Sequence, residues 1–137
     1  MDIPNYSPLP FDPKVLIVDD APFHRAFVAK ALSGLPAWLS YAREGREAIE
    51  LAIAERPALI LMDRVMPVMD GRTAALAIRR RPELKATQIL CVSANLDPAL
   101  LCDGTFNGHV EKPIQADALR ALVAERLGIT SWLRRAG

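Results

Sequence analysis

Carboxylates follow two apolar runs of this chain, at points where a buried strand would reach the surface. Asp63 ends the run 59–63, and the pair Asp19-Asp20 follows the run 14–18. An unpaired charge in a protein core is costly, so each of these carboxylates must face solvent, a basic group or a metal. Adjacent carboxylates also repel each other, and a cation between them relieves this repulsion. The pattern therefore predicts a site for a hard metal ion, with Asp63 as its reactive group.

A hydroxyl group follows a later apolar run, and an ammonium group follows the short strand that we expect over residues 109–111. They belong to Ser93 and Lys112. Around Mg²⁺, which prefers oxygen ligands, Asp20 and Asp63 would neutralise an incoming phosphoryl group. Ser93 and Lys112 would hold the remaining phosphoryl oxygens, since lysine binds phosphate as a compact charge. Because aspartate can accept phosphate as an acyl phosphate, these residue types indicate phosphoryl transfer to Asp63.

These groups can meet only if the chain folds as alternating strands and helices. We expect strands over residues 14–18, 37–42, 59–63, 88–92 and 109–111, and helices over residues 21–35, 46–56, 70–80, 97–102 and 115–127. Five such repeats with short loops require a parallel sheet with right-handed crossovers and helices on both faces. The carboxyl ends of parallel strands share one edge of the sheet, so the polar groups converge there.

Three of the helices carry specific expectations. The fourth is short, one or two turns capped by Asp97, because glycines follow it closely. His24, near the start of the first helix, could face the acidic site but is interpreted as an ordinary solvated residue. The apolar stripe of the first helix comprises Phe23, Ala26, Phe27, Ala31 and Leu32, and that of the last comprises Leu119, Leu122, Val123 and Leu127.

Length and composition exclude several classes of protein. A chain of 137 residues suits one domain. The net charge is only +1, so no broad basic surface for nucleic acid is expected, and the run Arg79-Arg80-Arg81 is interpreted as a solvated helix end. No apolar stretch reaches membrane-spanning length, so we expect a soluble, cytoplasmic protein without nucleic-acid or membrane partners. Cys91 and Cys102 are expected to be reduced. Residues 1–13 form a proline-rich extension, and 129–137 a tail with Trp132.

The motifs together resemble a known family. They are Val18-Asp19-Asp20, Leu61-Met62-Asp63, Met66 to Gly71, Val92-Ser93-Ala94-Asn95 and Lys112-Pro113. Over about residues 14–128 the chain resembles the receiver (CheY-like) domains of two-component response regulators. The resemblance implies a flavodoxin-like (βα)5 three-layer fold with parallel sheet order 2-1-3-4-5 and a shortened fourth helix. It also implies Mg²⁺-dependent transfer of phosphate from a histidine to Asp63, in a phosphoacceptor rather than an enzyme.

The resemblance further implies a role for each matching residue of the metal site. Asp20 and Asp63 would bind the metal directly, with the backbone carbonyl of Val65 as a third ligand and Asp19 acting through water. Val65 and Asn95 occupy positions that tune dephosphorylation.

Two matching residues would handle the phosphoryl group, and a third departs from the family. Ser93 would be the switch hydroxyl and Lys112 the phosphate-binding lysine, preceding a usually cis bond to Pro113. His109 stands where the family usually has Tyr or Phe, and acts either as a switch or as a solvated edge residue. Only 18 residues separate Ser93 from Lys112, which shortens the fourth helix.

The implied partners are a histidine kinase or histidine phosphotransfer protein as phosphodonor and an unknown downstream protein. We expect a monomer or weak dimer, serving as a stand-alone receiver or as the receiver of a hybrid kinase. A receiver-fold adaptor that binds its partner without phosphorylation is the alternative. A haloacid dehalogenase would need Asp-x-Asp after the first strand, and a flavodoxin a phosphate loop where Ala21-Pro22-Phe23-His24 stands.

Overall fold

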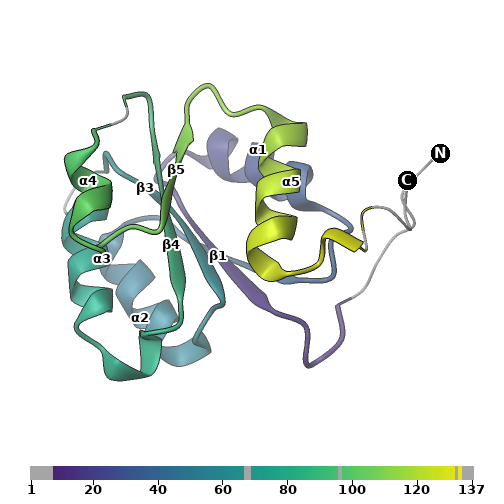
Figure 1. Ribbon diagram of the computed structural model, residues 1–137, viewed down its shortest axis with the longest axis horizontal. Helices are drawn as coiled ribbons and strands as arrows, with labels where there is room; N and C mark the ends of the chain where they lie inside the picture. The colour runs from purple at the N-terminus through teal and green to yellow at the C-terminus, as the bar shows by residue number, and fades with distance from the viewer. Residues whose placement is uncertain (1–7, 67–68, 96, 132, 134–137) are drawn as a thin grey trace.

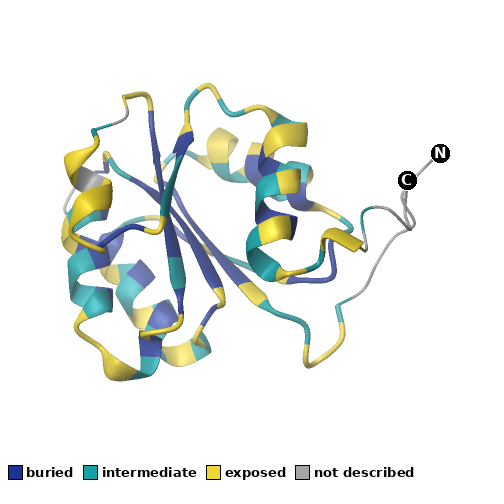
Figure 2. Cartoon of the chain, viewed as in Figure 1, coloured by how far each residue is buried: buried dark blue, intermediate teal, exposed yellow. Residues whose placement is uncertain are grey.

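A five-stranded parallel sheet forms the centre of the protein (Figure 1). The computed structural model describes residues 8–66, 69–95, 97–131 and 133. The sheet has the order β2-β1-β3-β4-β5, and every neighbouring pair is parallel, as predicted. Its strands are β1 (Lys14–Val18), β2 (Trp38–Ala42), β3 (Leu59–Asp63), β4 (Gln88–Ser93) and β5 (Gly108–Glu111). The three inner strands are buried on both faces, which explains their continuous apolar runs (Figure 2).

Helices cover both faces of the sheet and complete three layers. They are α1 (Pro22–Leu32), α2 (Gly45–Glu55), α3 (Gly71–Arg79), α4 (Ala99–Cys102) and α5 (Ala116–Leu127), with a 3₁₀ turn, η1 (Pro82–Leu84), that was not predicted. In Figure 1, α1 and α5 lie on one face, and α2 and α3 lie on the other. Two apolar cores result, one between the sheet and each helical layer.

The prediction for the buried face of α1 was right for Leu32 and wrong for Phe23 and Phe27. The helix buries Val28 and Leu32 against the sheet, whereas Phe23 is 89% exposed and Phe27 is 44% exposed. With about 3.6 residues per turn, Phe23 lies roughly 140° around the helix from Val28. The helix therefore cannot bury both, and it ends at Leu32 instead of continuing to residue 35.

The connection between β4 and β5 contains the short fourth helix that the sequence predicted. Asp97 Oδ1 accepts a hydrogen bond from Ala99 N at 3.0 Å, at the start of α4. Arg79 joins α3 to the segment after α4, where its Nε donates to Thr105 O at 3.0 Å, and to the residue before β4, where its Nη1 donates to Thr87 O at 2.7 Å. Arg79 Nη2 also donates to the side chain of Asn107. The guanidinium thus packs inward, and the expectation of a wholly solvated basic run was wrong for Arg79.

The C-terminal helix turns its apolar residues inward as predicted. Leu119 and Val123 are buried, and Leu122 and Leu127 pack at the edge of the same core. Leu133 also packs against this core, and Trp132 lies outside the described residues.

The N-terminal segment contacts β2, which is an edge strand. Trp38 Nε1 donates a hydrogen bond to Leu9 O at 2.8 Å, and a turn joins Leu9 to Asp12. Residues 1–7 of the predicted proline-rich extension lie outside the described residues.

Both cysteines are free, Cys91 in the buried strand β4 and Cys102 on the surface. Burial raises the pKa of the Cys91 thiol. No helix among the described residues has the length and apolar composition needed to cross a bilayer.

Candidate functional site

The predicted carboxylates meet at the carboxyl edge of the sheet. Asp19 and Asp20 follow β1 and Asp63 ends β3, so the pairing of these neighbouring strands brings the three together. One carboxylate oxygen from each lies within 4.8 Å of the others. Asp19 and Asp63 are each 4% exposed, whereas Asp20 is exposed. Three acidic oxygens this close fit a hard divalent cation such as Mg²⁺, which would offset their mutual repulsion.

Asp63 is held by two contacts to the same oxygen. Lys112 Nζ donates to Asp63 Oδ1 at 3.2 Å, and Val65 N donates to that oxygen at 3.4 Å. Burial, and then the charge of Asp19, raise the pKa of Asp63, while Lys112 acts against them. The carboxylate is therefore destabilised in its ionised form, and its reaction with an electrophile or its pairing with a cation would relieve that cost.

The strand–helix junction after Asp63 fits together tightly. Gly71, the first residue of α3, donates its N–H to Arg64 O at 3.0 Å. Asp70 caps the helix by accepting from Thr73 N at 2.8 Å, and this bond lowers the pKa of Asp70. Val65 is 76% exposed, so its apolar side chain points away from the core. Pro67 and Val68 of the predicted motif lie outside the described residues.

Lys112 approaches Asp63 from the end of β5. Its backbone N–H donates to Ser93 O at 2.9 Å, which fixes the ends of β4 and β5 together. The bond from Lys112 to Pro113 is cis, as the resemblance implied.

Ser93 ends β4, one residue beyond the Val92 that pairs with Asp63. The serine is 6% exposed, and its Oγ donates to Asn95 O at 2.8 Å. The same Oγ lies 2.9 Å from Nε2 of His109. His109 is half-buried on the edge strand β5, and its two interpretations, a switch or an edge residue, stay predictions.

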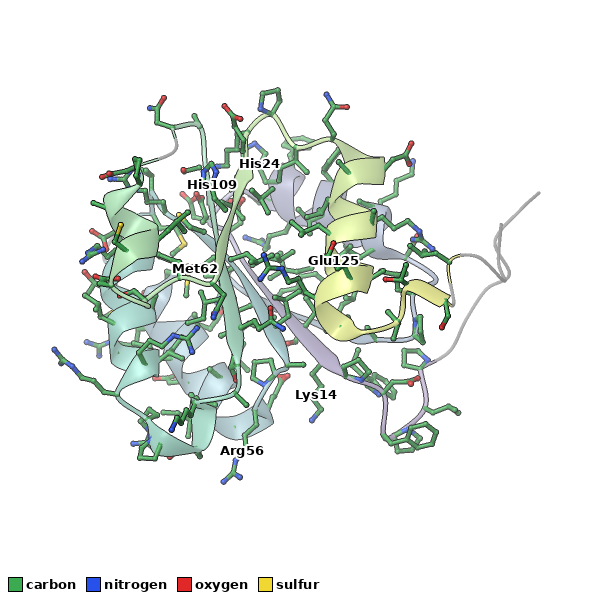
Figure 3. All side chains as sticks on the ribbon, in the orientation of Figure 1. Lys14, His24, Arg56, Met62, His109 and Glu125 are labelled. Atoms are coloured by element: carbon green, nitrogen blue, oxygen red, sulfur yellow. The ribbon has the colours of Figure 1, made fainter. Side chains whose placement is uncertain are left out.

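His24 faces the acidic site, as its place near the start of the first helix allowed, and its side chain is 54% exposed. Its Nδ1 lies 3.4 Å from Asp19 Oδ2, so the imidazole borders the acidic cluster. In Figure 3 the labelled His24 and His109 lie at one end of the molecule, and Lys14 and Arg56 lie at the other. Arg25 Nη1 also donates to Asp19 O at 2.7 Å. The first turn of α1 lies directly after Asp20, and this adjacency was the signal available in the sequence.

Comparison with known proteins gives one family. A family model described as "Response regulator receiver domain" matches residues 15–124. The sensor histidine kinase TmoS of Ectopseudomonas mendocina is 33% identical over 120 residues. That match covers 85% of this chain and 12% of the kinase, so the chain spans about an eighth of the length of this curated relative.

Solved structures show the same fold. The chemotaxis response regulator CheY4 of Vibrio cholerae has a TM-score of 0.76 and 30% identity, over 84% of this chain and 98% of that chain. The receiver domain of a sensor histidine kinase from Pseudomonas aeruginosa has a TM-score of 0.73 and 24% identity, covering 85% and 98%. The latter structure is described as having a magnesium ion coordinated in its active site cleft.

Proposed function

The chain belongs to the response regulator receiver domain family, and from this premise we propose that it takes a phosphoryl group from a phosphohistidine onto Asp63. The observation that carries the proposal is the buried Asp63 carboxylate, which is hydrogen-bonded to Lys112 and grouped with Asp19 and Asp20. Asp19 and Asp20 follow β1, Asp63 ends β3 and Lys112 follows β5, so the groups come from three strands that end at one edge of the parallel sheet, which supports the proposal.

The reaction is a displacement at phosphorus. An oxygen of Asp63 forms the new P–O bond as the P–N bond to the donor imidazole breaks, and the imidazole leaves with that electron pair. Lys112 and Ser93 would then bind the oxygens of the transferred group. Asp20, Asp63 and the backbone carbonyl of Val65 would hold Mg²⁺, with Asp19 acting through water, and the ion would neutralise the phosphoryl charge. The domain itself would then catalyse both its phosphorylation and its dephosphorylation.

Exposed residues at the edge of the site would control the rate at which the acyl phosphate is hydrolysed. Val65 has no side-chain donor or acceptor, so it cannot orient an attacking water. Asn95, which is exposed and follows Ser93 by two residues, has an amide that can. We assign the tuning of phosphate lifetime to these two positions.

An exposed apolar surface beside Lys112 supports the phosphodonor assignment. Phe23 and Phe27 from α1, together with Pro113 and Ile114 from the loop after β5, line a pocket of about 450 Å³ that reaches Lys112. A helix presenting a phosphohistidine could bury these rings while its imidazole points at Asp63. We propose a histidine kinase or phosphotransfer protein as this partner, which the domain would meet in the cytoplasm as a monomer or weak dimer. The output partner is unidentified.

Transfer from a ³²P-labelled histidine kinase tests the proposal. Wild-type protein should gain label in Mg²⁺, lose it in hydroxylamine, which cleaves acyl phosphates, and gain none in EDTA. Asp63→Asn is the matched control, since it keeps the size of the side chain but removes the nucleophile. A folded wild-type domain that stays unlabelled across several kinases and small phosphodonors would favour an adaptor that binds without phosphorylation.

A further inference from the structure

Three groups from the segment that follows Asp19 surround this residue. Ala21 N donates to the carboxylate oxygen Oδ1 at 2.9 Å, and Arg25 Nη1 donates to the backbone carbonyl oxygen of Asp19 at 2.7 Å. The imidazole of His24 approaches the other carboxylate oxygen, with Nδ1 3.4 Å from Oδ2. The start of α1 therefore holds Asp19 in place and brings a nitrogen ligand to the edge of the acidic cluster.

The distance between the imidazole and the carboxylate suits two ligands of one metal ion. Two ligands of a tetrahedral zinc ion with bonds of about 2.1 Å lie about 3.4 Å apart. His24 Nδ1 and Asp19 Oδ2 are 3.4 Å apart. Asp19 also belongs to the group whose carboxylate oxygens lie within 4.8 Å of one another, together with Asp20 and Asp63. The His24 side chain is 54% exposed, so its ring can adjust to an ion at this cluster without losing buried contacts.

A nitrogen ligand changes which metal ions the site prefers. Mg²⁺ binds oxygen ligands and keeps several of its waters, so an imidazole adds little to its affinity. Zn²⁺ is a borderline ion for which imidazole and carboxylate are both ordinary ligands. His24 beside three carboxylates should therefore raise the affinity of the site for Zn²⁺ and leave its affinity for Mg²⁺ nearly unchanged.

We propose that His24 is a metal ligand, which acts with Asp19 and the neighbouring carboxylates and makes the site bind Zn²⁺ in preference to Mg²⁺. This inference deepens the proposed function and rests on its metal site. Removing a group that only supports a metal ligand typically lowers metal affinity by about 10–100-fold, so loss of the imidazole should weaken Zn²⁺ binding by about tenfold or more. Binding of Mg²⁺ should stay within about twofold, because its ligands are oxygens.

Calorimetric titrations with Zn²⁺ and with Mg²⁺ test this role, with thermal melts to verify folding. They use a Cys102→Ser background, because the exposed thiol of Cys102 can itself bind zinc. His24→Gln removes the imidazole and keeps a polar side chain, and His109→Gln, which removes the other histidine of the chain, is the matched control. We expect His24→Gln to bind Zn²⁺ about tenfold or more weakly than the background protein, and His109→Gln to bind both ions as that protein does.

Imidazole ¹⁵N spectra give a second readout that leaves His24 intact. The His109→Gln protein retains a single histidine, so Zn²⁺ should shift one ring nitrogen of His24 and Mg²⁺ should not. An unchanged Zn²⁺ affinity in His24→Gln, equal losses for the two ions, an equal Zn²⁺ loss in His109→Gln, or ring nitrogens that do not respond to Zn²⁺ would overturn the role of His24 and leave the carboxylate site standing. A background protein that binds neither ion would instead overturn the metal site of the proposed function, and the inference with it.

Discussion

Gly71 is the residue at which the fold and the site constrain each other most directly. A Cβ at this position would overlap the carbonyl oxygen of Asp63 and would lie 3.0 Å from both Arg64 Cα and the carbonyl carbon of Asp63. All of these are backbone atoms, so no side-chain rotation can relieve the overlap. Gly71→Ala must therefore push the start of α3 away from the end of β3.

The size of the effect follows from these contacts. Carbon atoms pack best at about 3.5–4.0 Å, so the 3.0 Å approaches alone require a shift of about 0.5–1 Å, and the overlap with the carbonyl oxygen of Asp63 requires about 1 Å or more. Overpacking of this kind costs about 1–3 kcal/mol, against a gain of at most about 1 kcal/mol from replacing a helical glycine. We expect the free energy of unfolding to fall by about 1–2 kcal/mol and the melting temperature by about 5 °C.

Guanidinium unfolding and labelling by acetyl phosphate measure the two consequences. Labelling should slow by about tenfold or more, because a shift of this size misplaces the Asp63 nucleophile. Gly104→Ala is the matched control: its φ is +79° and nothing lies within 4 Å of the added Cβ. It should lose about 1–2 kcal/mol through left-handed strain and keep the wild-type labelling rate. A Gly71→Ala protein as stable and as readily labelled as wild type would refute the reasoning.

Three further predictions concern Asp63, Arg79 and Phe23. Because the pKa of Asp63 is raised, the folded protein binds this proton more tightly than the unfolded chain, so the free energy of unfolding falls as pH rises from the unfolded pKa through the folded one. In metal-free buffer Asp63→Asn should therefore melt higher than wild type at neutral pH and lose that advantage in acid; melts that differ equally at every pH would contradict this. Arg79→Lys should lower the free energy of unfolding by about 2–3 kcal/mol, because a lysine cannot donate to the Thr87 and Thr105 carbonyls together. Amide hydrogen exchange should become faster over residues 103–107. Unchanged exchange there would show that Arg79 does not hold this segment in place. Phe23→Ala should change the free energy of unfolding by less than about 0.5 kcal/mol and leave the rate of labelling by acetyl phosphate unchanged. It should slow transfer from a phosphohistidine protein about tenfold. Equal slowing with both donors would argue against docking of the phosphodonor at α1.

The alternation of strands and helices was sufficient to predict a parallel sheet and the edge at which the polar residues meet, whereas the strand order was implied by the family resemblance. Asp63 ends an apolar run that must be a buried parallel strand, Lys112 follows the short segment expected to be the last strand, and the topology then brings them together. The short α4 was also predictable, because Pro98 and the later glycines limit any helix there.

Contacts that depend on the phase of a helix or on a side-chain rotamer could not be predicted. In α1, Phe23 and Phe27 are four residues apart, and so are Val28 and Leu32, so the apolar pattern allowed either pair to face the sheet. Arg79 belongs to a basic run, and its inward hydrogen bonds depend on the course of the β4–β5 connection. The imidazole contacts to Asp19 and Ser93 likewise require the tertiary structure.

Intact mass after incubation with Mg²⁺ and acetyl phosphate, beside Asp63→Asn, tests the phosphoacceptor assignment most directly. The account predicts that the wild-type protein gains the mass of one phosphate, and that this gain disappears in the variant and in EDTA. No gain by a folded wild-type protein, or an equal gain by Asp63→Asn, would contradict the account.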